Sequence, residues 1–364
     1  MPHLFVDISS HGFGHLAQTG PVLNALAAIV PDLRLTIRSG LATKQLQLRI
    51  EPAFAHLPGA SDVAFLMHDA VRLDREATAA AYRSVHADWA ARVADEAGFL
   101  SALAPDLVLS NISALPLAGA RQAGIPALAL CSLNWADQFR YLYTGEAWAE
   151  DIAEQLMAAY AGADAFLRCL PALPMPGLKN TVDIPPLACI GEDRRAQLEH
   201  LLGRQGERLV LVAMGGIGFQ LPLAQWPQVP GIRWLIAEPL PVARPDVSAY
   251  APLGEQGMPF TDLLASVDAI VTKPGYGTFV EAATAGTPVL YLQRDLWPEQ
   301  DVLIEWLQQE VRCEEISAEE FSSGQLAGKL DRLWSLPGKQ VSANGAGIAA
   351  EAIAAQLKRN SRNA

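Results

Sequence analysis

The chain has 364 residues, 51% of them hydrophobic and 18% charged, which is enough for two globular domains that each bury a core. Its 27 basic and 39 acidic residues give a formal net charge of −12. A chain this acidic has no long-range attraction for DNA, RNA or an anionic membrane surface. Nucleic acid is therefore not an expected partner, although a local basic patch can still bind a small phosphate.

The cysteines and the N-terminal residues favour a cytoplasmic protein. The sequence has no CxxC motif and no His/Cys cluster, so neither a disulfide framework nor a metal site is predicted from its four scattered cysteines. The first residues, MPHLFVDISS, lack a basic region followed by a long apolar run, so no signal peptide is expected. No stretch of about 18 apolar residues predicts a transmembrane helix. The sequence carries no signal for an oligomeric state.

The first half of the chain alternates apolar strands with helices. Short apolar runs predict strands at residues 4–8, 34–38, 106–110 and 125–130. Helical patterns are predicted at residues 16–29, 74–100 and 114–123. Strands that are apolar on both sides and are separated by helices indicate a parallel sheet covered on both faces.

A proline-rich stretch at residues 171–186, PALPMPGLKNTVDIPP, interrupts this alternation. Because proline cannot donate to a strand ladder, this stretch is predicted to be a linker. Further strands are predicted at residues 208–213, 233–237, 269–272 and 288–292, and a last helix at 344–358. The fold class is therefore α/β, with two Rossmann-like doubly wound parallel-sheet domains. The predicted boundaries are 1–170 for the first domain, 171–187 for the linker, 188–342 for the second domain and 343–364 for a C-terminal helix and tail.

A glycine-rich loop at residues 10–15, SHGFGH, follows the first predicted strand. Its glycines let the backbone approach a ligand, and the helix that follows offers free N–H groups. The segment GFGHLA also fits the loose dinucleotide fingerprint, but the second strand ends in Arg38 and not in an acidic residue, which disfavours NAD and leaves NADP only weak support. His11 and His15 are each candidate general bases, since imidazole titrates near neutral pH. A tight turn with two solvated histidines is the alternative.

Two glycine clusters follow strands of the second half. Residues 214–218, MGGIG, occupy the position equivalent to the first loop, although a turn that needs positive φ explains them equally well. Residues 273–281, KPGYGTFVE, suit a tight strand-to-helix turn in which Thr278 can cap the helix and offer a hydroxyl group to a phosphate. Glu281 then falls one turn into the helix, where a carboxylate can accept hydrogen bonds from a ribose.

A polar loop at residues 293–300, QRDLWPEQ, follows the next predicted strand. Ligands of open parallel sheets bind at the carboxyl ends of the strands. Glu299 and Gln300 can therefore fix sugar hydroxyl groups with a carboxylate and an amide, and Asp295 lies in the same loop. A solvated start of a helix is the alternative explanation for these residues.

Together these motifs resemble the donor-binding domain of GT-B glycosyltransferases, and most closely that of MurG-like enzymes, which move N-acetylglucosamine from UDP-N-acetylglucosamine. The chain has PGxxTxxE ending at Glu281, then AGTP, then the pair Glu299–Gln300, where that family has SGxxTxxE, AxGxP and a pair of Gln or Asp-Gln. The resemblance implies two domains that face each other across a cleft, with the diphosphate on the glycine turn, the ribose on Glu281 and the donor sugar on the later pair. The implied donor-site residues are Gly14, Gly215, Gly216, Lys273, Gly275, Tyr276, Gly277, Thr278, Glu281, Asp295, Glu299 and Gln300.

Three departures from the family pattern affect this reading. Pro274 replaces the usual serine, Glu299 stands where Asp or Gln is common, and Lys273 is additional and can neutralise diphosphate charge. The chain has no DxD motif, so metal-independent chemistry is expected, in which a helix N-terminus and basic residues hold the diphosphate. No metal and no cofactor are expected besides the nucleotide sugar itself.

The first half adds a second resemblance, which covers nearly the whole chain. The loop HGFGH is similar to the Gly-Gly-His loop of the same enzymes, with His15 at the position of the histidine near donor and acceptor. HGFGH, DLVLSN, NWADQFRY and the KPGYGT region resemble the glycosyltransferase-like N-terminal region of plant arabinokinases. No counterpart of their kinase half is present, so sugar kinase activity is not expected. The implied acceptor-side residues are Ser110, Asn111, Asn134 and Trp135, with Asp137 as an alternative base.

The function implied by these resemblances is transfer of a hexose or N-acetylhexosamine from a nucleotide sugar, a UDP-sugar by preference, to an acceptor that the sequence does not identify. Two alternatives share the fold. One is a UDP-sugar 2-epimerase or hydrolase, and the other is a UDP-sugar-binding protein without catalytic activity.

Overall fold

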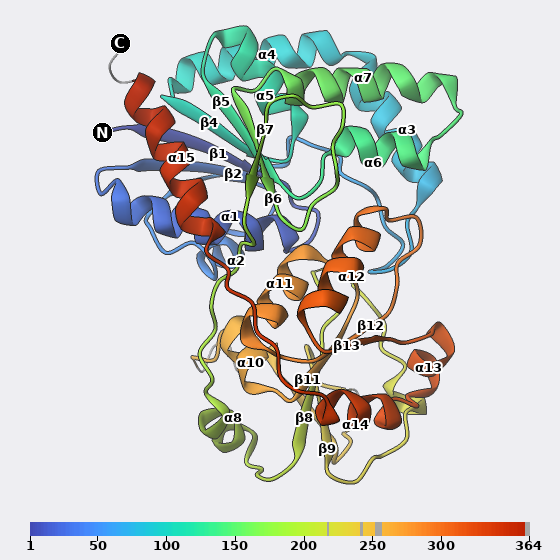
Figure 1. Ribbon diagram of the computed structural model, residues 1–364. Helices are drawn as coiled ribbons and strands as arrows, with labels where there is room; N and C mark the ends of the chain where they lie inside the picture. The colour runs from blue at the N-terminus through green and yellow to red at the C-terminus, as the bar shows by residue number, and fades with distance from the viewer. Residues whose placement is uncertain (217, 241–242, 252–256, 361–364) are drawn as a thin grey trace.

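The computed structural model describes residues 1–216, 218–240, 243–251 and 257–360. Two α/β domains lie end to end, each with a parallel sheet between layers of helices (Figure 1). This confirms the predicted fold class. Within the described residues, no helix is both long and apolar enough to cross a membrane.

The first sheet has seven strands in the order β3-β2-β1-β4-β5-β6-β7, all paired in parallel. The central strands form because short apolar runs such as LFV and LVL are buried between the helical layers. The strands are β1 (His3–Ile8), β2 (Arg34–Ser39), β3 (Ala55–Pro58), β4 (Leu107–Asn111), β5 (Ala127–Cys131), β6 (Ala165–Cys169) and β7 (Thr181–Ile184).

The second sheet has six parallel strands in the order β10-β9-β8-β11-β12-β13. Its strands are β8 (Arg208–Val212), β9 (Ile232–Ile236), β10 (Val247–Ala249), β11 (Ala269–Thr272), β12 (Val289–Tyr291) and β13 (Cys313–Glu315). The four strands at the sheet edges, β3, β7, β10 and β13, were not predicted, and neither was β6. Edge strands are short and carry few apolar residues, so the buried-strand pattern does not detect them.

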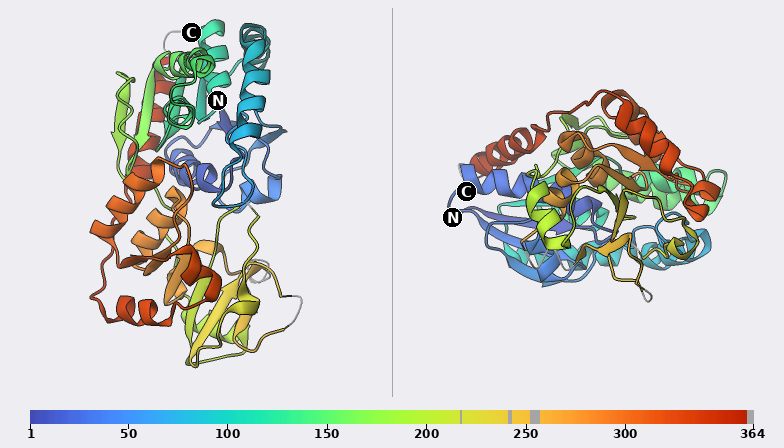
Figure 2. Two further views of the ribbon diagram at one scale, coloured as in Figure 1. Left: turned by 90° about the vertical axis from the view of Figure 1, so that its right-hand side faces the viewer. Right: turned by 90° about the horizontal axis from the view of Figure 1, so that it is seen from below.

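Helices cover both sheets, as a side view and a view from below show (Figure 2). Those of the first domain are α1 (Gly14–Ile29), α2 (Thr43–Gln47), α3 (Arg75–Ala87), α4 (Trp89–Leu103), α5 (Ala114–Ala123), α6 (Trp135–Leu142) and α7 (Ala147–Ala161). Those that follow are α8 (Arg195–Leu202), the 3-10 helix η1 (Leu223–Gln225), α10 (Phe260–Ser266), α11 (Tyr276–Ala285), α12 (Glu299–Glu310), α13 (Ala318–Ser323), α14 (Ala327–Ser335) and α15 (Gly345–Asn360).

Two segments differ from the sequence prediction. The single helix expected at residues 74–100 is two helices, α3 and α4, which meet at Asp88. The proline-rich stretch contains strand β7, whose four proline-free residues pair with β6 at the sheet edge, where one side needs no partner. The expected linker segment is therefore partly built into the first sheet.

The C-terminal helix α15 returns to the first domain and packs beside α1 (Figure 1). One cluster of buried apolar side chains includes Leu16 of α1, Phe279 of α11 and Ile353 of α15. The apolar core is therefore continuous from one domain to the other.

Helices α1 and α11 approach each other closely at one glycine. A Cβ atom added to Gly277 would lie 2.6 Å from Cβ of Ala17, a separation that real Cβ atoms do not reach. Because Gly277 lacks that atom, the first turns of the two helices can lie side by side.

Replacing Gly277 with alanine is therefore expected to destabilise the protein by about 1–3 kcal/mol through overpacking. The matched control is Gly98→Ala on α4, where an added Cβ meets nothing within 4 Å and should stabilise the helix by about 1 kcal/mol. The second change Ala17→Gly should restore part of the loss. Urea unfolding measures all three, and a Gly277→Ala protein as stable as the wild type would contradict the close contact.

Candidate functional site

The three glycine loops predicted from the sequence meet where the two domains join. An added Cβ on Gly216, after β8, would lie 2.7 Å from the ring of Phe13, which lies in the loop after β1. Gly215 has a φ of +87°, and an added Cβ would lie 3.4 Å from the side chain of Lys273, after β11. The carboxyl ends of both sheets therefore face the same place.

Two helices begin at this junction. Helix α1 begins at Gly14 and α11 at Tyr276, and their first turns are in contact. The free N–H groups and the positive dipole ends of both helices are thus directed to one region, an arrangement that suits an anion. The prediction that Thr278 caps this helix is wrong, because α11 begins two residues before it and Gly275 is the capping residue. The Thr278 hydroxyl lies in the first turn instead.

His15 is buried beside the junction. Its Nδ1 atom lies 2.9 Å from Oδ1 of Asn111, at the end of β4, and its ring has an edge-on contact with Trp135. Burial lowers the pKa of His15 to about 4, against a smaller opposing effect of the Asn111 bond. The imidazole is therefore neutral at pH 7, as a general base must be.

His11 of the first domain contacts an aromatic side chain of the second domain. Its ring stacks on Trp297, with centroids 5.3 Å apart and planes 6° apart, and the guanidinium of Arg294 lies 3.6 Å from the centroid of Trp297. Burial, with smaller effects of Arg294, His15 and Lys273, lowers the pKa of His11 well below its usual value. Its Nε2 atom is buried without a hydrogen-bond partner among the described residues.

Lys273 and Arg294 supply positive charge beside the helix starts. Burial, with repulsion from Arg294, lowers the pKa of Lys273 to about 7. Burial lowers the pKa of Arg294 to about 10, and its Nε atom has no partner in the described part of the chain. Neither side chain forms an ion pair within the described residues. Both cations are thus destabilised in the free protein.

Glu281 already has a charged partner. It is buried, and it pairs with Arg49 of the first domain through two contacts, one of them 3.2 Å from Nη2 to Oε2. Burial raises the pKa of Glu281, while Arg49 opposes that rise. The predicted ribose carboxylate therefore joins the two domains in this structure, and its role toward ribose stays a prediction.

The predicted sugar-binding pair is also engaged. Glu299 accepts hydrogen bonds from the Ser132 hydroxyl at 2.6 Å and from Nε1 of Trp297 at 3.1 Å. The amide of Gln300 bonds to both the N–H and the carbonyl of Arg294, at 2.8 and 2.9 Å, and so holds the backbone of that arginine. Asp295 is exposed to solvent, and its backbone N–H donates to the carbonyl of Val71.

The acceptor-side residues divide into two groups. Asn111 contacts His15, and the buried ring of Trp135 lies edge-on to both histidines. Asn134 instead caps helix α6 and holds the carboxylate of Asp137 at 2.7 Å, and Ser110 donates to a backbone carbonyl. Asp137, predicted as an alternative base, therefore belongs to a helix start, and no contact joins it to either histidine within the described residues.

Tyr276 bonds to the backbone near the linker and not toward the glycine loops. Its hydroxyl donates to the carbonyl of Leu170 at 2.9 Å and accepts from the N–H of Leu187 at 3.0 Å. The tyrosine thus ties the two ends of the proline-rich segment to α11.

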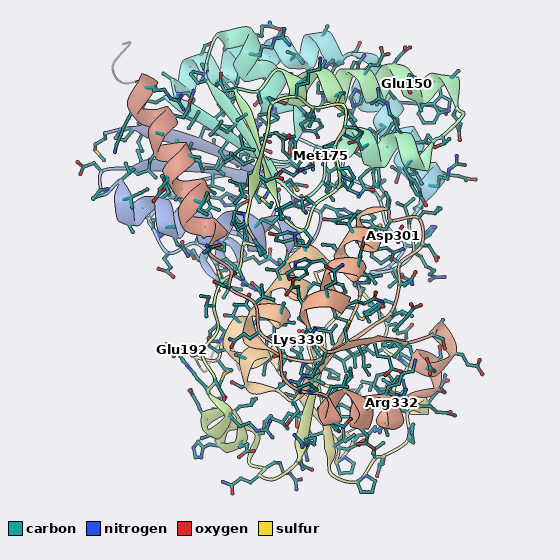
Figure 3. The ribbon with its side chains drawn as sticks, viewed as in Figure 1. Glu150, Met175, Glu192, Asp301, Arg332 and Lys339 are labelled. Atoms are coloured by element: carbon teal, nitrogen blue, oxygen red, sulfur yellow. The ribbon has the colours of Figure 1, made fainter. Side chains whose placement is uncertain are left out.

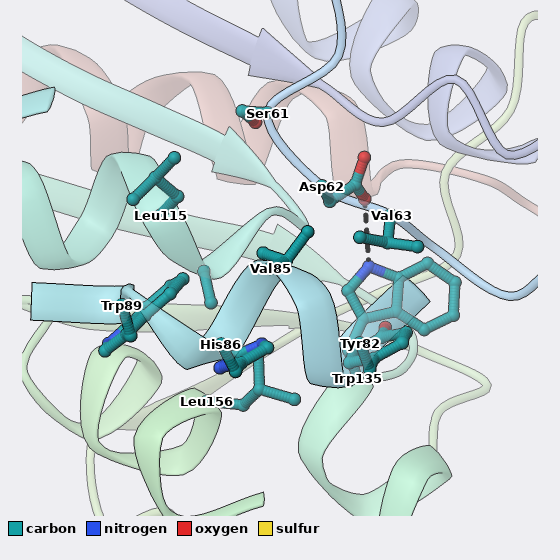
Figure 4. A pocket seen from close by; sticks show the side chains of 11 residues that line it. Ser61, Asp62, Val63, Tyr82, Val85, His86, Trp89, Leu115, Trp135 and Leu156 are labelled. Carbon is teal, nitrogen blue, oxygen red and sulfur yellow. Dashed lines mark hydrogen bonds between the residues drawn. The ribbon is translucent and has the colours of Figure 1, made fainter. Parts of the chain in front are cut away.

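A small cavity of about 20 Å³ lies in the first domain, between Asp62, Tyr82, His86 and Trp135 (Figure 4). This volume has room for about one water molecule. Asp62 accepts a hydrogen bond from Nε1 of Trp135 at 3.1 Å. Burial, with a smaller effect of Asp7, raises the pKa of Asp62 to about 6.

Several residues of the site were not predicted from the sequence. They are Gln18, Arg49, Asp62, Ser132, Arg294 and Trp297. Arg294 and Trp297 stand in the polar loop that was singled out, so the position of that loop was a usable signal. The other four lie in ordinary helix or loop sequence and join the site only through tertiary contacts. No group of three or more His, Cys, Asp or Glu side chains suited to a metal occurs in the described ranges, and the expected metal independence stays a prediction.

Comparison with known proteins identifies the fold. The calicheamicin glycosyltransferase CalG4 is similar with a TM-score of 0.64 at 16% identity, over 98% of this chain and 99% of its own. The glycosyltransferase of kitacinnamycin gives 0.61 at 16% identity, over 99% and 96% of the two chains. LpCGTa in complex with UDP gives 0.55 at 15% identity, over 100% and 95%. The chain therefore has the GT-B fold, as the resemblance predicted.

Comparison by sequence gives a low similarity to a known protein. L-arabinokinase of Arabidopsis thaliana is 23% identical over 359 residues, which are 95% of this chain and 33% of the relative. The chain thus spans about a third of that protein's length. No protein-family profile matches the chain.

The raised pKa of Asp62 leads to a prediction about stability. In the folded protein this pKa is about 6, against 3.8 for an ordinary aspartate, so the ionised group lowers stability as the pH rises from about 4 to about 6. Asp62→Asn should therefore stabilise the protein by about 2–3 kcal/mol at pH 7 and by little at pH 4. The exposed Asp151→Asn on α7 is the control. Urea unfolding at both pH values checks this, and equal effects at the two pH values would refute it.

Proposed function

We propose that this protein is a glycosyltransferase that moves a hexose or N-acetylhexosamine from a nucleotide sugar, a UDP-sugar by preference, to an acceptor. One observation carries the proposal. Lys273 and Arg294 lie at the junction where two helices begin. Their pKa values are lowered despite the attraction of Glu299, and neither forms an ion pair among the described residues. Burial of a cation without a paired anion destabilises the folded protein unless a ligand supplies the missing negative charge. A diphosphate has the required charge and size.

The fold supports the same assignment. The GT-B neighbours are glycosyltransferases, and one of them is described in complex with UDP. In our proposal the diphosphate lies between the loops after β1, β8 and β11. The preference for UDP and for an N-acetylhexosamine rests on the MurG-like motifs at Glu281 and Glu299. To contact a donor, Glu281 must exchange Arg49 for the ribose, whereas Glu299 can keep Ser132 on Oε1 and turn Oε2 from Trp297 to the sugar.

His15 is the proposed base. Its Nε2 atom takes the proton of the acceptor hydroxyl, the acceptor oxygen bonds to the anomeric carbon, and the carbon–oxygen bond to the diphosphate breaks. The departing diphosphate keeps the electron pair, and Lys273, Arg294 and the helix starts stabilise its charge. No step of this scheme requires a metal ion.

The proposal is tested by donor binding and turnover. Arg294→Gln should weaken binding of a UDP-sugar by about 10- to 100-fold, since a charged hydrogen bond to phosphate is lost. Arg332→Gln is the control, because Arg332 lies on α14, far from the domain junction (Figure 3). Calorimetry with UDP- and dTDP-sugars measures affinity.

His15→Ala should leave donor binding intact and reduce release of UDP at least about 100-fold, the contribution of a general base. Unchanged turnover would remove His15 from the mechanism. Rapid release of UDP, or epimer formation, without any acceptor would favour the hydrolase or epimerase alternative.

The pKa of Lys273 also predicts how binding depends on pH. A bound diphosphate favours the protonated lysine, while free Lys273 loses its proton above a pH of about 7. The affinity for a UDP-sugar should therefore fall about tenfold between pH 6 and pH 8, and binding at pH 8 should take up close to one proton. Lys273→Met should abolish both effects. Calorimetry in buffers of different ionisation enthalpy counts the protons, and pH-independent binding by the wild type would contradict this placement of Lys273.

A further inference from the structure

A continuous chain of buried hydrogen bonds joins Glu299 in the second domain to His15 in the first. The Ser132 hydroxyl lies 2.6 Å from Oε1 of Glu299, and Nε2 of Gln18 lies 2.8 Å from that hydroxyl. Nδ2 of Asn111 lies 3.2 Å from Oε1 of Gln18, and Oδ1 of Asn111 lies 2.9 Å from Nδ1 of His15. All five residues are buried.

The carboxylate at one end fixes the direction of every bond. An ionised Glu299 can only accept, so the Ser132 hydroxyl donates to it and accepts from the amino group of Gln18. The carbonyl oxygen of Gln18 then faces Asn111, which must present its amino group there. The oxygen of Asn111 is left for His15, whose Nδ1 atom must therefore carry the proton.

Other contacts of Asn111 give the same orientation independently. Its Nδ2 atom also lies 3.3 Å from the carbonyl oxygen of His15 and 3.0 Å from Oγ1 of Thr19. The Thr19 hydroxyl donates its proton to the carbonyl of His15, so its oxygen accepts from Asn111. Three acceptors surround this nitrogen, and the reversed amide would place oxygen against oxygen.

We infer that Glu299 is a positioning residue for His15, acting through Ser132, Gln18 and Asn111 as a relay that fixes the histidine tautomer. Nδ1 of His15 is held protonated, so Nε2 keeps its lone pair for the acceptor hydroxyl. Every donor in the relay points toward the carboxylate, so the aligned dipoles also favour the positive charge that His15 acquires during reaction. The catalytic part of this inference rests on the proposed function.

The relay crosses the domain junction. His15, Gln18, Asn111 and Ser132 belong to the first domain, and Glu299 belongs to the start of α12 in the second. The carboxylate therefore supports His15 only while the domains are closed at this point. Domain closure excludes water from the site and orients His15 at the same time. The relay therefore links domain closure to catalysis.

Few other charged groups are close enough to compete with the relay. His11 lies on the same loop as His15, and Lys273 and Arg294 are close enough to lower the pKa of His11. The Sγ atom of Cys131, at the end of β5, is 3.8 Å from Nδ1 of His15, and burial raises the pKa of this thiol, so it is neutral. Trp135 of α6 covers the ring without charge.

Nuclear magnetic resonance of the full chain, with histidine labelled by nitrogen-15, tests the relay without any substrate. At pH 7, His15 in the wild type should be protonated on Nδ1. Ser132→Ala breaks the relay in the middle, and exchange of the Nδ1 proton with water should become about tenfold faster. Glu299→Gln should act in the same direction. The matched control is Asp301→Asn, an exposed acidic residue of the same helix turn, which should change nothing (Figure 3).

A second substitution distinguishes loss of His15 positioning from a general loss of structure. Asn111→Asp places one carboxylate oxygen directly beside Nδ1 of His15, so the distant carboxylate is no longer needed. The other oxygen replaces Nδ2, so the Gln18 amide and the Thr19 hydroxyl must turn to donate to it. In this background Ser132→Ala should have no further effect on Nδ1 exchange, and it should no longer cause the roughly tenfold loss of kcat that it causes alone. Donor affinity, measured for each variant, should stay unchanged for Ser132→Ala.

The outcomes separate the relay from the proposed function. Protonation of His15 on Nε2 in the wild type, or Nδ1 exchange that Ser132→Ala leaves unchanged, would overturn the relay even if turnover is found. The expected resonance results, combined with no binding of nucleotide sugars, would keep the relay as a structural feature and refute the function.

Discussion

The close approach of α1 and α11 is the constraint on which the site depends. Gly277 has no side chain, and the small side chain of Ala17 fills the space that results. The starts of two helices from different domains can therefore lie together. This places the histidine loop of the first domain opposite the lysine loop of the second, and it directs two sets of free N–H groups to one region.

The distribution of charge then distinguishes this region from the rest of the protein. Arg38 and Arg49 are only slightly exposed, and each is paired with buried carboxylates, Asp7 and Glu96 for the first and Glu281 for the second. Lys273 and Arg294 lack such partners in the described chain and have lowered pKa values. Arg38 and Arg49 are thus neutralised by carboxylates of the protein itself, while the two cations at the junction, attracted by Glu299 without an ion pair, can be neutralised further by a ligand.

The hydrogen-bond partner of His15 at the junction is a neutral side chain. Asn111 orients the ring without adding a negative charge beside the expected diphosphate. The carboxylate that ends the relay, Glu299, lies on the second domain, accepts a bond from Trp297 and attracts Lys273 and Arg294. The base is therefore oriented by tertiary contacts from both domains, and its pKa is set mainly by burial.

Much of the architecture could be predicted from the sequence, because buried parallel strands leave a strong local pattern. The central strands and the loops at their carboxyl ends were located this way, while the short edge strands, which bury less, were missed. For the site, the sequence predicted the loops but not the contacts that their side chains make. Glu281 and Glu299 lie near the predicted loops, but their present partners, Arg49 and Ser132, carry no local signal.

The sequence by itself thus determined the alternation of strands and helices, the three glycine loops and the positions of His15 and Lys273, since each depends on neighbours in the chain. Contacts between distant segments leave Arg294 without an ion pair among the described residues, pair Glu281 across the domains and connect Glu299 to His15. The physical reason is that burial and pairing depend on residues that are distant in sequence, and these determine the charge and the hydrogen bonds of a site.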